Sequence, residues 1–186
     1  MTVSTCKRLF TVAEYERMVQ VGIFAEDDRL ELINGEILEM SPIGSRHAAC
    51  VRRLQQLFTR QLGDRALVDV QNPLILHDRS EPLPDVVLLK PQPDFYAAGH
   101  PRPDDVLLVI EVADTSLAYD RDTKVPAYAS SGIPEVWVVD LTSATVWVYR
   151  APAPGGYQEI TDVRGPARIA PQAFPDLQVA VESIVG

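Results

Sequence analysis

Cysteine and histidine are scarce in this sequence, and it has no surplus of positive charge. The chain of 186 residues holds two cysteines, Cys6 and Cys50, and three histidines, which excludes a disulfide framework and a Cys/His zinc cluster. Because Cys50 falls on the apolar side of a predicted helix, we expect two unpaired thiols. No apolar run approaches the roughly 18 residues of a membrane-spanning helix, and no apolar segment follows Lys7 and Arg8 as in a signal peptide. We therefore expect a cytoplasmic protein.

The charge balance is the reverse of that in most nucleic-acid-binding proteins. Seventeen basic residues stand against 26 acidic ones, so the net charge is -9, whereas domains that bind nucleic acids are usually basic. The excess of acidic residues is unevenly distributed along the chain. Residues 1–62 hold eight basic and eight acidic residues, and residues 63–186 carry the whole net charge of -9. A polyanionic partner should therefore prefer the N-terminal third.

The N-terminal third predicts a helix, a hairpin and a second helix. The first helix should begin at Thr11, because a Thr followed three residues later by Glu14 is typical of a capping box. Asn34-Gly35 separates two alternating apolar runs and accepts the positive φ angles of a type I′ turn, which predicts a β-hairpin. Residues 45–63 have apolar side chains at helical spacing, so this helix should pack one face on a sheet.

The remainder of the chain reads mainly as short strands. We expect them at residues 66–70, 73–77, 84–89, 104–113, 133–140 and 144–150, with one or two more beyond residue 156. Residues 116–132 predict a helix in which Pro126 makes a kink or a new start. With 46% hydrophobic residues, the pattern predicts one α/β domain over residues 1–186, a mixed β-sheet flanked by helices with an N-terminal helix and β-hairpin.

Glu111 interrupts an otherwise apolar strand. An isolated buried carboxylate costs several kcal/mol or takes up a proton, so a metal ion, a buried Arg or Lys, or the open end of the sheet must compensate it. Perturbed acids gather at functional sites. The residue is therefore a candidate for metal binding or catalysis, and a structural ion pair is the alternative.

Asp85 opens the preceding apolar strand. The Pro-Asp pair occurs four times in the chain and says little by itself, but only Asp85 enters an apolar strand directly. If the two strands are neighbours, Asp85 and Glu111 converge on one hard cation through oxygen ligands. The alternative is a turn at the strand entry, in which Asp85 bonds to the local backbone.

Lys124 and Glu31 complete the group of candidates. Lys124, on the helix after Glu111, would orient or deprotonate an attacking water and offset charge on a phosphoryl group, or else form a surface pair with Asp120. In the hairpin, Glu31 faces Leu38 on a mostly apolar side, which suggests a second metal contact or a partly exposed residue at a sheet margin.

A basic stripe follows the second predicted helix. Arg46, Arg53 and Arg60 recur every seven residues and so lie along one side, where they would touch a phosphate backbone or simply meet solvent. His47, at the start of the same helix, would contact phosphate or a water, or lie on the surface.

Several of these residues lie in motifs that resemble a known family. The segments LELINGEILEMSPIGSRH, PLPDVVLL, LLVIEVADTS and YDRDTKVPAYASSGIPEVWVVD resemble the Uma-two family of restriction-endonuclease-like proteins, a branch of the PD-(D/E)XK nuclease superfamily. The resemblance runs from about Thr11 to Tyr149 and includes the closing APQAFPDLQVAVESI.

The resemblance implies a restriction-endonuclease-like fold and assigns roles. Asp85 and Glu111 match the two metal-binding acids, and Glu31 matches the acid from the N-terminal part. The superfamily lysine stands two residues after the second acid, where this chain has Ala113, so the resemblance implies that Lys124 has taken its role. His47 falls where the family tends to have a histidine.

We therefore expect a Mg²⁺- or Mn²⁺-dependent endonuclease that hydrolyses DNA phosphodiester bonds, because carboxylate ligands suit Mg²⁺ better than zinc. One rival is a catalytically silent module with the same fold that acts through a protein or nucleic-acid partner, supported by the net charge of -9. Another is a carboxylate-pair hydrolase such as a glycosidase, opposed by Lys124 and by the lack of a sugar-stacking aromatic residue near Asp85 or Glu111. A nuclease acting on both strands would usually need a homodimer, for which the strands of Trp137 and Trp147 offer a candidate surface.

Overall fold

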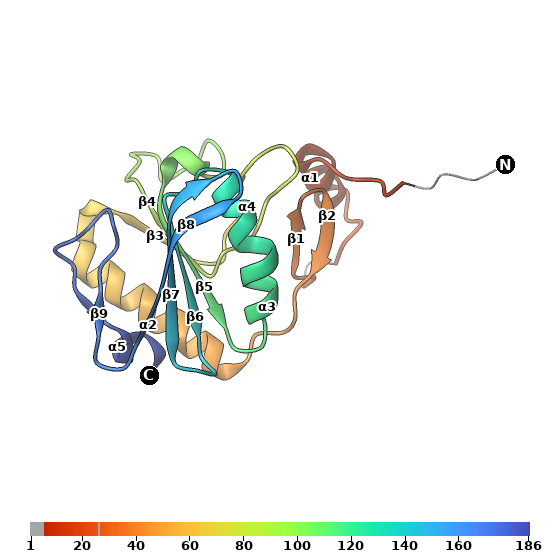
Figure 1. Ribbon diagram of the computed structural model, residues 1–186. Helices are drawn as coiled ribbons and strands as arrows, with labels where there is room; N and C mark the ends of the chain where they lie inside the picture. Colours follow the sequence, from red (N-terminus) through yellow and green to blue (C-terminus); the bar gives the residue numbers. More distant parts are fainter. Residues whose placement is uncertain (1–5, 26) are drawn as a thin grey trace.

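Six strands form the central sheet of the computed structural model, which describes residues 6–25 and 27–186 (Figure 1). In spatial order they are β3 (Leu67–Asp69), β4 (Val86–Leu89), β5 (Val106–Ala113), β6 (Glu135–Asp140), β7 (Thr145–Ala153) and β8 (Gly156–Arg164). Neighbouring strands run antiparallel except β5 and β6, which are parallel. The predicted mixed α/β fold is confirmed.

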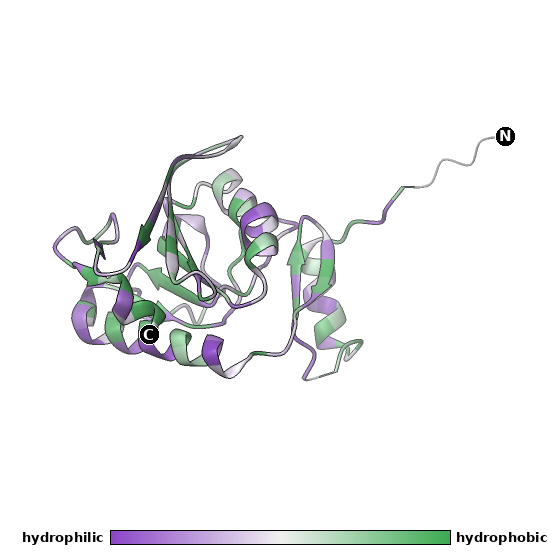
Figure 2. Ribbon diagram, turned by 60° about the horizontal axis from the view of Figure 1, so that its bottom comes forward, coloured by the Kyte–Doolittle hydropathy of each residue, from purple (hydrophilic) through white to green (hydrophobic). Residues whose placement is uncertain are grey.

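Helices cover both faces of this sheet. On one face lie α2 (Ser45–Leu62) and α5 (Val181–Val185), which share an apolar core with β4 to β7. On the other face lie α3 (Leu117–Tyr119), the π-helical turn η3 (Asp120–Lys124) and α4 (Val125–Ser130). Because both faces are covered, the central strands are almost continuously apolar, as the green strands of Figure 2 show.

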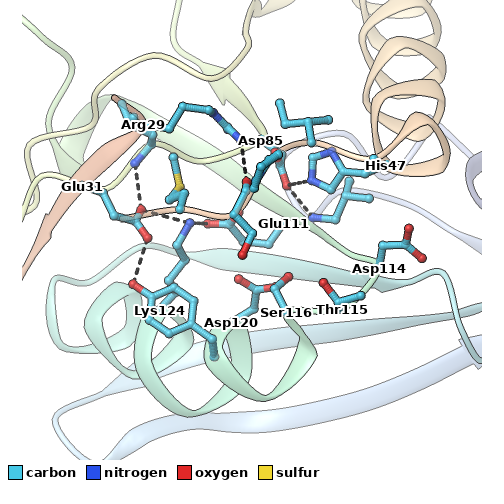
Figure 3. Close-up of a pocket in the computed structure, with 18 of the residues that line it drawn as sticks. Arg29, Glu31, His47, Asp85, Glu111, Asp114, Thr115, Ser116, Asp120 and Lys124 are labelled. Carbon is cyan, nitrogen blue, oxygen red and sulfur yellow. Dashed lines mark hydrogen bonds and ion pairs between the residues drawn. The ribbon is translucent and has the colours of Figure 1, made fainter. Parts of the chain in front are cut away.

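The N-terminal elements form a separate layer beyond α3 and α4 (Figure 1). Helix α1 (Val12–Gln20) packs on one side of the hairpin of β1 (Leu30–Ile33) and β2 (Glu36–Glu39), with Leu32 in their shared core. Along β1 side chains alternate between the two faces, so Glu31 points away from α1 and toward the rest of the protein (Figure 3).

The local signals at the N-terminus are confirmed. The Thr11 hydroxyl accepts a hydrogen bond from the Glu14 N–H, and the Glu14 carboxylate accepts one from the Thr11 N–H. Asn34 and Gly35 have φ angles of 51° and 82°, as a type I′ turn requires. A side chain at Gly35 would also meet Leu9, with a Cβ–Cβ distance of 2.8 Å.

The helix expected at residues 116–132 is divided. Pro126 has no N–H to donate and its ring crowds the carbonyl four residues earlier. The chain just before it widens into η3, where the Val125 N–H bonds to the Asp120 carbonyl five residues back. Pro126 then lies in the first turn of α4, so it marks a new start.

Two strand predictions are wrong. Residues 73–77 form no strand of the sheet. The Leu74 and Leu76 N–H groups bond to carbonyls of the segment 80–82 just after them, the Ile75 N–H bonds to the Pro101 carbonyl, and only the isolated bridge of His77 with Ser80 is formed. The C-terminal part holds more than expected: β8 returns antiparallel to β7, and β9 (Arg168–Ile169), β10 (Val179–Ala180) and α5 follow. Short 3₁₀ turns, η1 (Gly63–Arg65) and η2 (Pro103–Asp105), complete the elements.

Both cysteines are unpaired, Cys6 exposed and Cys50 buried, as expected. Within residues 6–25 and 27–186, none of the helices combines the length and apolarity needed to cross a bilayer. The aromatic strand pair is not an open surface, because Trp137 is fully buried in the core and the Arg121 guanidinium lies 4.5 Å from the centre of the Trp147 ring. Trp137 is therefore a core residue, and a homodimer stays a prediction.

Candidate active site

A pocket of about 570 Å³ lies where the N-terminal hairpin faces the end of β5 (Figure 3). Five of the eight predicted site residues line it, each from a different part of the chain: Glu31, His47, Asp85, Glu111 and Lys124. The fold thus gathers on one cavity the acids and the lysine that the sequence singled out.

Strand register brings Asp85 beside Glu111. Val86 pairs with Ile110 in the antiparallel ladder of β4 and β5, so the next position along the ladder sets Asp85 opposite Glu111. Alternation directs both carboxyl groups to the face that α3 and α4 cover. The predicted adjacency of these two strands is confirmed.

Lys124 occupies the centre of the cluster. Its Nζ lies 3.1 Å from Glu31 Oε2 and 3.2 Å from Glu111 Oε1. Lys124 and Asp120 are each only 4% exposed, so a surface pair is wrong, and the Asp120 carboxylate instead accepts a hydrogen bond from the Ser116 hydroxyl. The structure thus shows a buried ammonium bridging two acids.

Glu31 is held by three donors. Its Oε1 accepts a hydrogen bond from the Tyr119 hydroxyl at 2.8 Å, and its Oε2 accepts from the Leu83 N–H and faces Lys124. The side chain is fully buried, so the alternative of a partly exposed residue at a sheet margin is wrong. Glu31 acts in this structure as the anchor of Lys124.

Glu111 has one engaged oxygen and one free oxygen. The Tyr128 hydroxyl donates to Oε1 at 2.5 Å, and Lys124 approaches the same atom. The described residues donate no hydrogen bond to Oε2. Tyr128 is fully buried, so it is not a sugar-stacking aromatic of the kind whose lack argues against a glycosidase.

Asp85 is fixed as an ionised group. Its Oδ1 accepts from Gln71, and its Oδ2 accepts from His47 Nε2 at 3.0 Å and from the Val112 N–H at 2.9 Å. Burial by itself would raise the pKa of Asp85, but the bonds from His47, Val112 and Gln71 outweigh it and the pKa is lowered. The backbone partner belongs to the neighbouring strand, not to a local turn.

Burial also shifts the pKa values of other ionisable groups in the pocket. Burial raises the pKa of Glu111 to about 8, although the Lys124 ammonium opposes the rise. Burial likewise raises the pKa of Asp120 to about 6. For Lys124 burial alone would lower the pKa, but the attraction of Glu111 and Glu31 raises it above the ordinary value. Lys124 therefore stays an ammonium at neutral pH.

The donor set fits a magnesium-like ion. The described residues contain no ready cluster of three His, Cys, Asp or Glu side chains around one point, so a closed protein cage is not present among them. Mg²⁺ instead takes one or two carboxylates and completes its shell with waters and substrate phosphates. Asp85 and the free Oε2 of Glu111 would supply those carboxylates.

None of the three arginines of the stripe is among the residues that line the pocket. Arg46 donates to Asp114 Oδ1 at 3.1 Å and to the Leu141 carbonyl at 2.8 Å. Arg53 donates to two carbonyls near the C-terminus, and Arg60 is exposed near the end of α2. Contact of the three with DNA stays a prediction, but two of them already bind parts of this chain.

Comparison with known proteins identifies a family for this chain. The profile of the family Uma2, described as "Putative restriction endonuclease", matches residues 12–182. The chain belongs to the Uma2 family. Among solved structures, it is similar to a "putative nuclease belonging to DUF820" from Anabaena variabilis, with a TM-score of 0.73 and 18% sequence identity over 95% of this chain and 97% of that one. No curated protein matches it.

The Uma2 match confirms the resemblance seen in the sequence motifs and spans the segment between residues 150 and 170 that those motifs omit. At 18% identity, the solved neighbour supports the fold alone.

Sequence reasoning missed two tyrosines of this Uma2 site. Tyr128 stands four residues after Lys124, so helical spacing could have set the two side chains on one face. Tyr119 stands five residues before Lys124, and it reaches the same site because η3 adds a residue to the turn between them. No local pattern predicts that extra residue.

Proposed function

We propose that this Uma2 protein is a Mg²⁺- or Mn²⁺-dependent endonuclease that hydrolyses phosphodiester bonds of DNA, with Asp85 and Glu111 as metal ligands. The observation that carries the proposal is the buried Lys124 ammonium beside Glu111, whose strand register sets Asp85 next to it. A structural ion pair would need one acid, whereas this cluster also holds an ionised Asp85 and a free oxygen of Glu111.

Each residue of the cluster has a role that its contacts support. When bound, a divalent cation supplies Lewis-acid activation of water and neutralises charge on the phosphoryl group. Asp85 is held ionised by His47 and two other donors, ready to bind a cation. Lys124 stabilises the negative charge that develops on the phosphate oxygens, since it is a fixed ammonium in a site of low dielectric. Its raised pKa opposes the alternative role of a general base.

The charge of the pocket makes a cation necessary for a polyanionic substrate. Among the described residues, the lining includes six carboxylate side chains, from Glu31, Glu39, Asp85, Glu111, Asp114 and Asp120, but two basic side chains besides His47, from Arg29 and Lys124. A phosphodiester would be repelled from such a pocket until divalent cations compensate the acids.

Cleavage of supercoiled plasmid in Mn²⁺ or Mg²⁺ tests this function. We expect Glu111→Gln to lose both cleavage and the heat of metal binding in calorimetry while its circular dichroism stays native. Glu159→Gln, an exposed acid on β8, is the matched control and should keep both. Equal cleavage by Glu111→Gln and the wild type would refute the assignment.

A silent binding module is the second candidate, and one observation favours it: the buried charges of Glu31, Glu111 and Lys124 already satisfy one another without a metal. The same assay separates the two, because a silent module would cleave no nucleic acid in any metal tested.

The proposed nuclease would act in the cytoplasm, and as a homodimer where it cuts both strands of DNA. Sedimentation equilibrium tests the assembly, and a monomer at all concentrations would refute it.

A further inference from the structure

The groups assigned to catalysis lie at the base of the pocket, not on the surface. Glu31 is 0% exposed, Glu111 2%, Lys124 4% and Asp85 8%. The hairpin and the segment after it wall one side, and α3 walls the other (Figure 3). A phosphate that reacts here must therefore enter the pocket, since these side chains cannot come out to meet it.

Double-stranded DNA is poorly suited to that entry. A duplex is stiff, with a persistence length of about 50 nm, so its phosphates stay on the outside of a straight rod. It also carries one charge per roughly 1.7 Å, twice the density of a single strand, and the pocket lining includes the exposed carboxylate of Glu39. A flexible strand with half the charge density meets less repulsion and can bend inward.

One wall of the pocket is apolar. Leu38 and Met40 from the hairpin side, Ile43 before α2 and Leu83 before β4 line it together with the acids. Ile43 is 39% exposed, although it is a large hydrophobic side chain. Contact with these apolar side chains would not stabilise a charged phosphate backbone. It would stabilise the flat face of a nucleobase, because base faces are apolar and are usually buried by stacking.

We propose that the pocket takes a nucleotide that is not base-paired, with its base against Leu38, Met40 and Ile43 and its phosphate toward Glu111 and Lys124. The preferred substrate is then single-stranded DNA or an unpaired stretch within a duplex. This inference rests on the proposed nuclease function and narrows its substrate.

Fluorescence anisotropy in Ca²⁺ measures the preference without depending on cleavage. The probes are one labelled 12-nucleotide DNA strand and the same strand annealed to its complement. We expect the single strand to bind the wild type at least tenfold more tightly than the duplex. Equal or tighter binding of the duplex, or no binding of the single strand, overturns the inference.

Two matched substitutions locate the base. Ile43→Ser should weaken single-strand binding about tenfold, the effect expected of a base-facing side chain. Ile160→Ser, which removes a similarly exposed isoleucine on β8, should leave it unchanged. Equal affinities of the two variants for the single strand would show that the base does not contact this wall. Unchanged thermal unfolding of both variants shows that the comparison is one of binding.

Cleavage of a duplex with a central unpaired stretch in Mn²⁺ then separates this inference from the function beneath it. We expect the wild type to cut within the unpaired stretch. Cutting of the paired arms at the same rate would overturn the substrate inference but would still support the proposed nuclease function. No cutting at all would refute the nuclease, while the anisotropy result would still decide what the pocket binds.

Discussion

Replacing Lys124 by Met removes the positive charge at the centre of the cluster and keeps most of the side-chain volume. The ammonium lies 3.1 Å from Glu31 and 3.2 Å from Glu111, and all three side chains are buried. Breaking a buried ion pair by removing one partner usually costs about 3–5 kcal/mol, because the remaining charge is uncompensated. We expect a loss of this size in the free energy of unfolding of Lys124→Met at pH 9.

The loss should shrink as the pH falls. In the folded wild type the pKa of Glu111 is about 8, above its ordinary 4.5, so Glu111 lowers stability progressively as the pH rises from 4.5 through 8. Without Lys124 that pKa rises further, and each extra unit removes about 1.4 kcal/mol more at high pH. At pH 5 the folded state already holds the Glu111 proton in both proteins, so the substitution should cost less there, and the remaining loss comes from the broken pair with Glu31. Lys124 itself does not titrate in this range, because its pKa is raised.

Urea denaturation at pH 5, 7 and 9, with and without Mn²⁺, measures these differences. A bound cation would replace part of the missing charge, so Mn²⁺ at 100 times its Kd for Lys124→Met should stabilise this variant by roughly 2.7 kcal/mol. Single-turnover cleavage should fall by on the order of 10²-fold or more, the scale of a charge-stabilising group. A loss of stability that is equal at pH 5 and pH 9 would refute the electrostatic reasoning. Unchanged cleavage would remove Lys124 from the reaction.

Further predictions follow from individual contacts. Protons and cations compete for Glu111, because its pKa is raised to about 8. The apparent Mg²⁺ affinity in calorimetry should therefore fall about tenfold per pH unit below that value. An affinity that does not change from pH 6 to 9 would contradict this. Tyr128→Phe removes the hydroxyl bonded to Glu111 Oε1 and should lower the free energy of unfolding by about 1–3 kcal/mol, and an unchanged urea midpoint would count against the contact. Arg60→Gln should reduce the salt slope of DNA binding by about 0.9, whereas Arg53→Gln should lower the melting temperature and leave the slope unchanged, because Arg53 binds carbonyls of this chain.

The sequence by itself determined the elements whose cause is local. Asn34-Gly35 specifies the hairpin because few other residue pairs accept two positive φ angles. Thr11 and Glu14 begin α1 because they satisfy its free N–H groups. Apolar runs predicted β4 and β5 because both faces of these strands are covered, and the same rule made Glu111 conspicuous as an acid in an apolar strand.

The tertiary structure alone decided what surrounds Glu111. Glu31 and Lys124 are 93 positions apart, and they meet because the hairpin packs beside α3 and because the chain from Asp120 to Lys124 forms a π-helical turn. The same packing buries Lys124, brings Tyr119 and Tyr128 to the two acids, and ties Arg46 and Arg53 to carbonyls far along the chain. Local pattern cannot predict such contacts, since side-chain periodicity specifies which face a residue occupies and only the packing of distant segments specifies what that face meets.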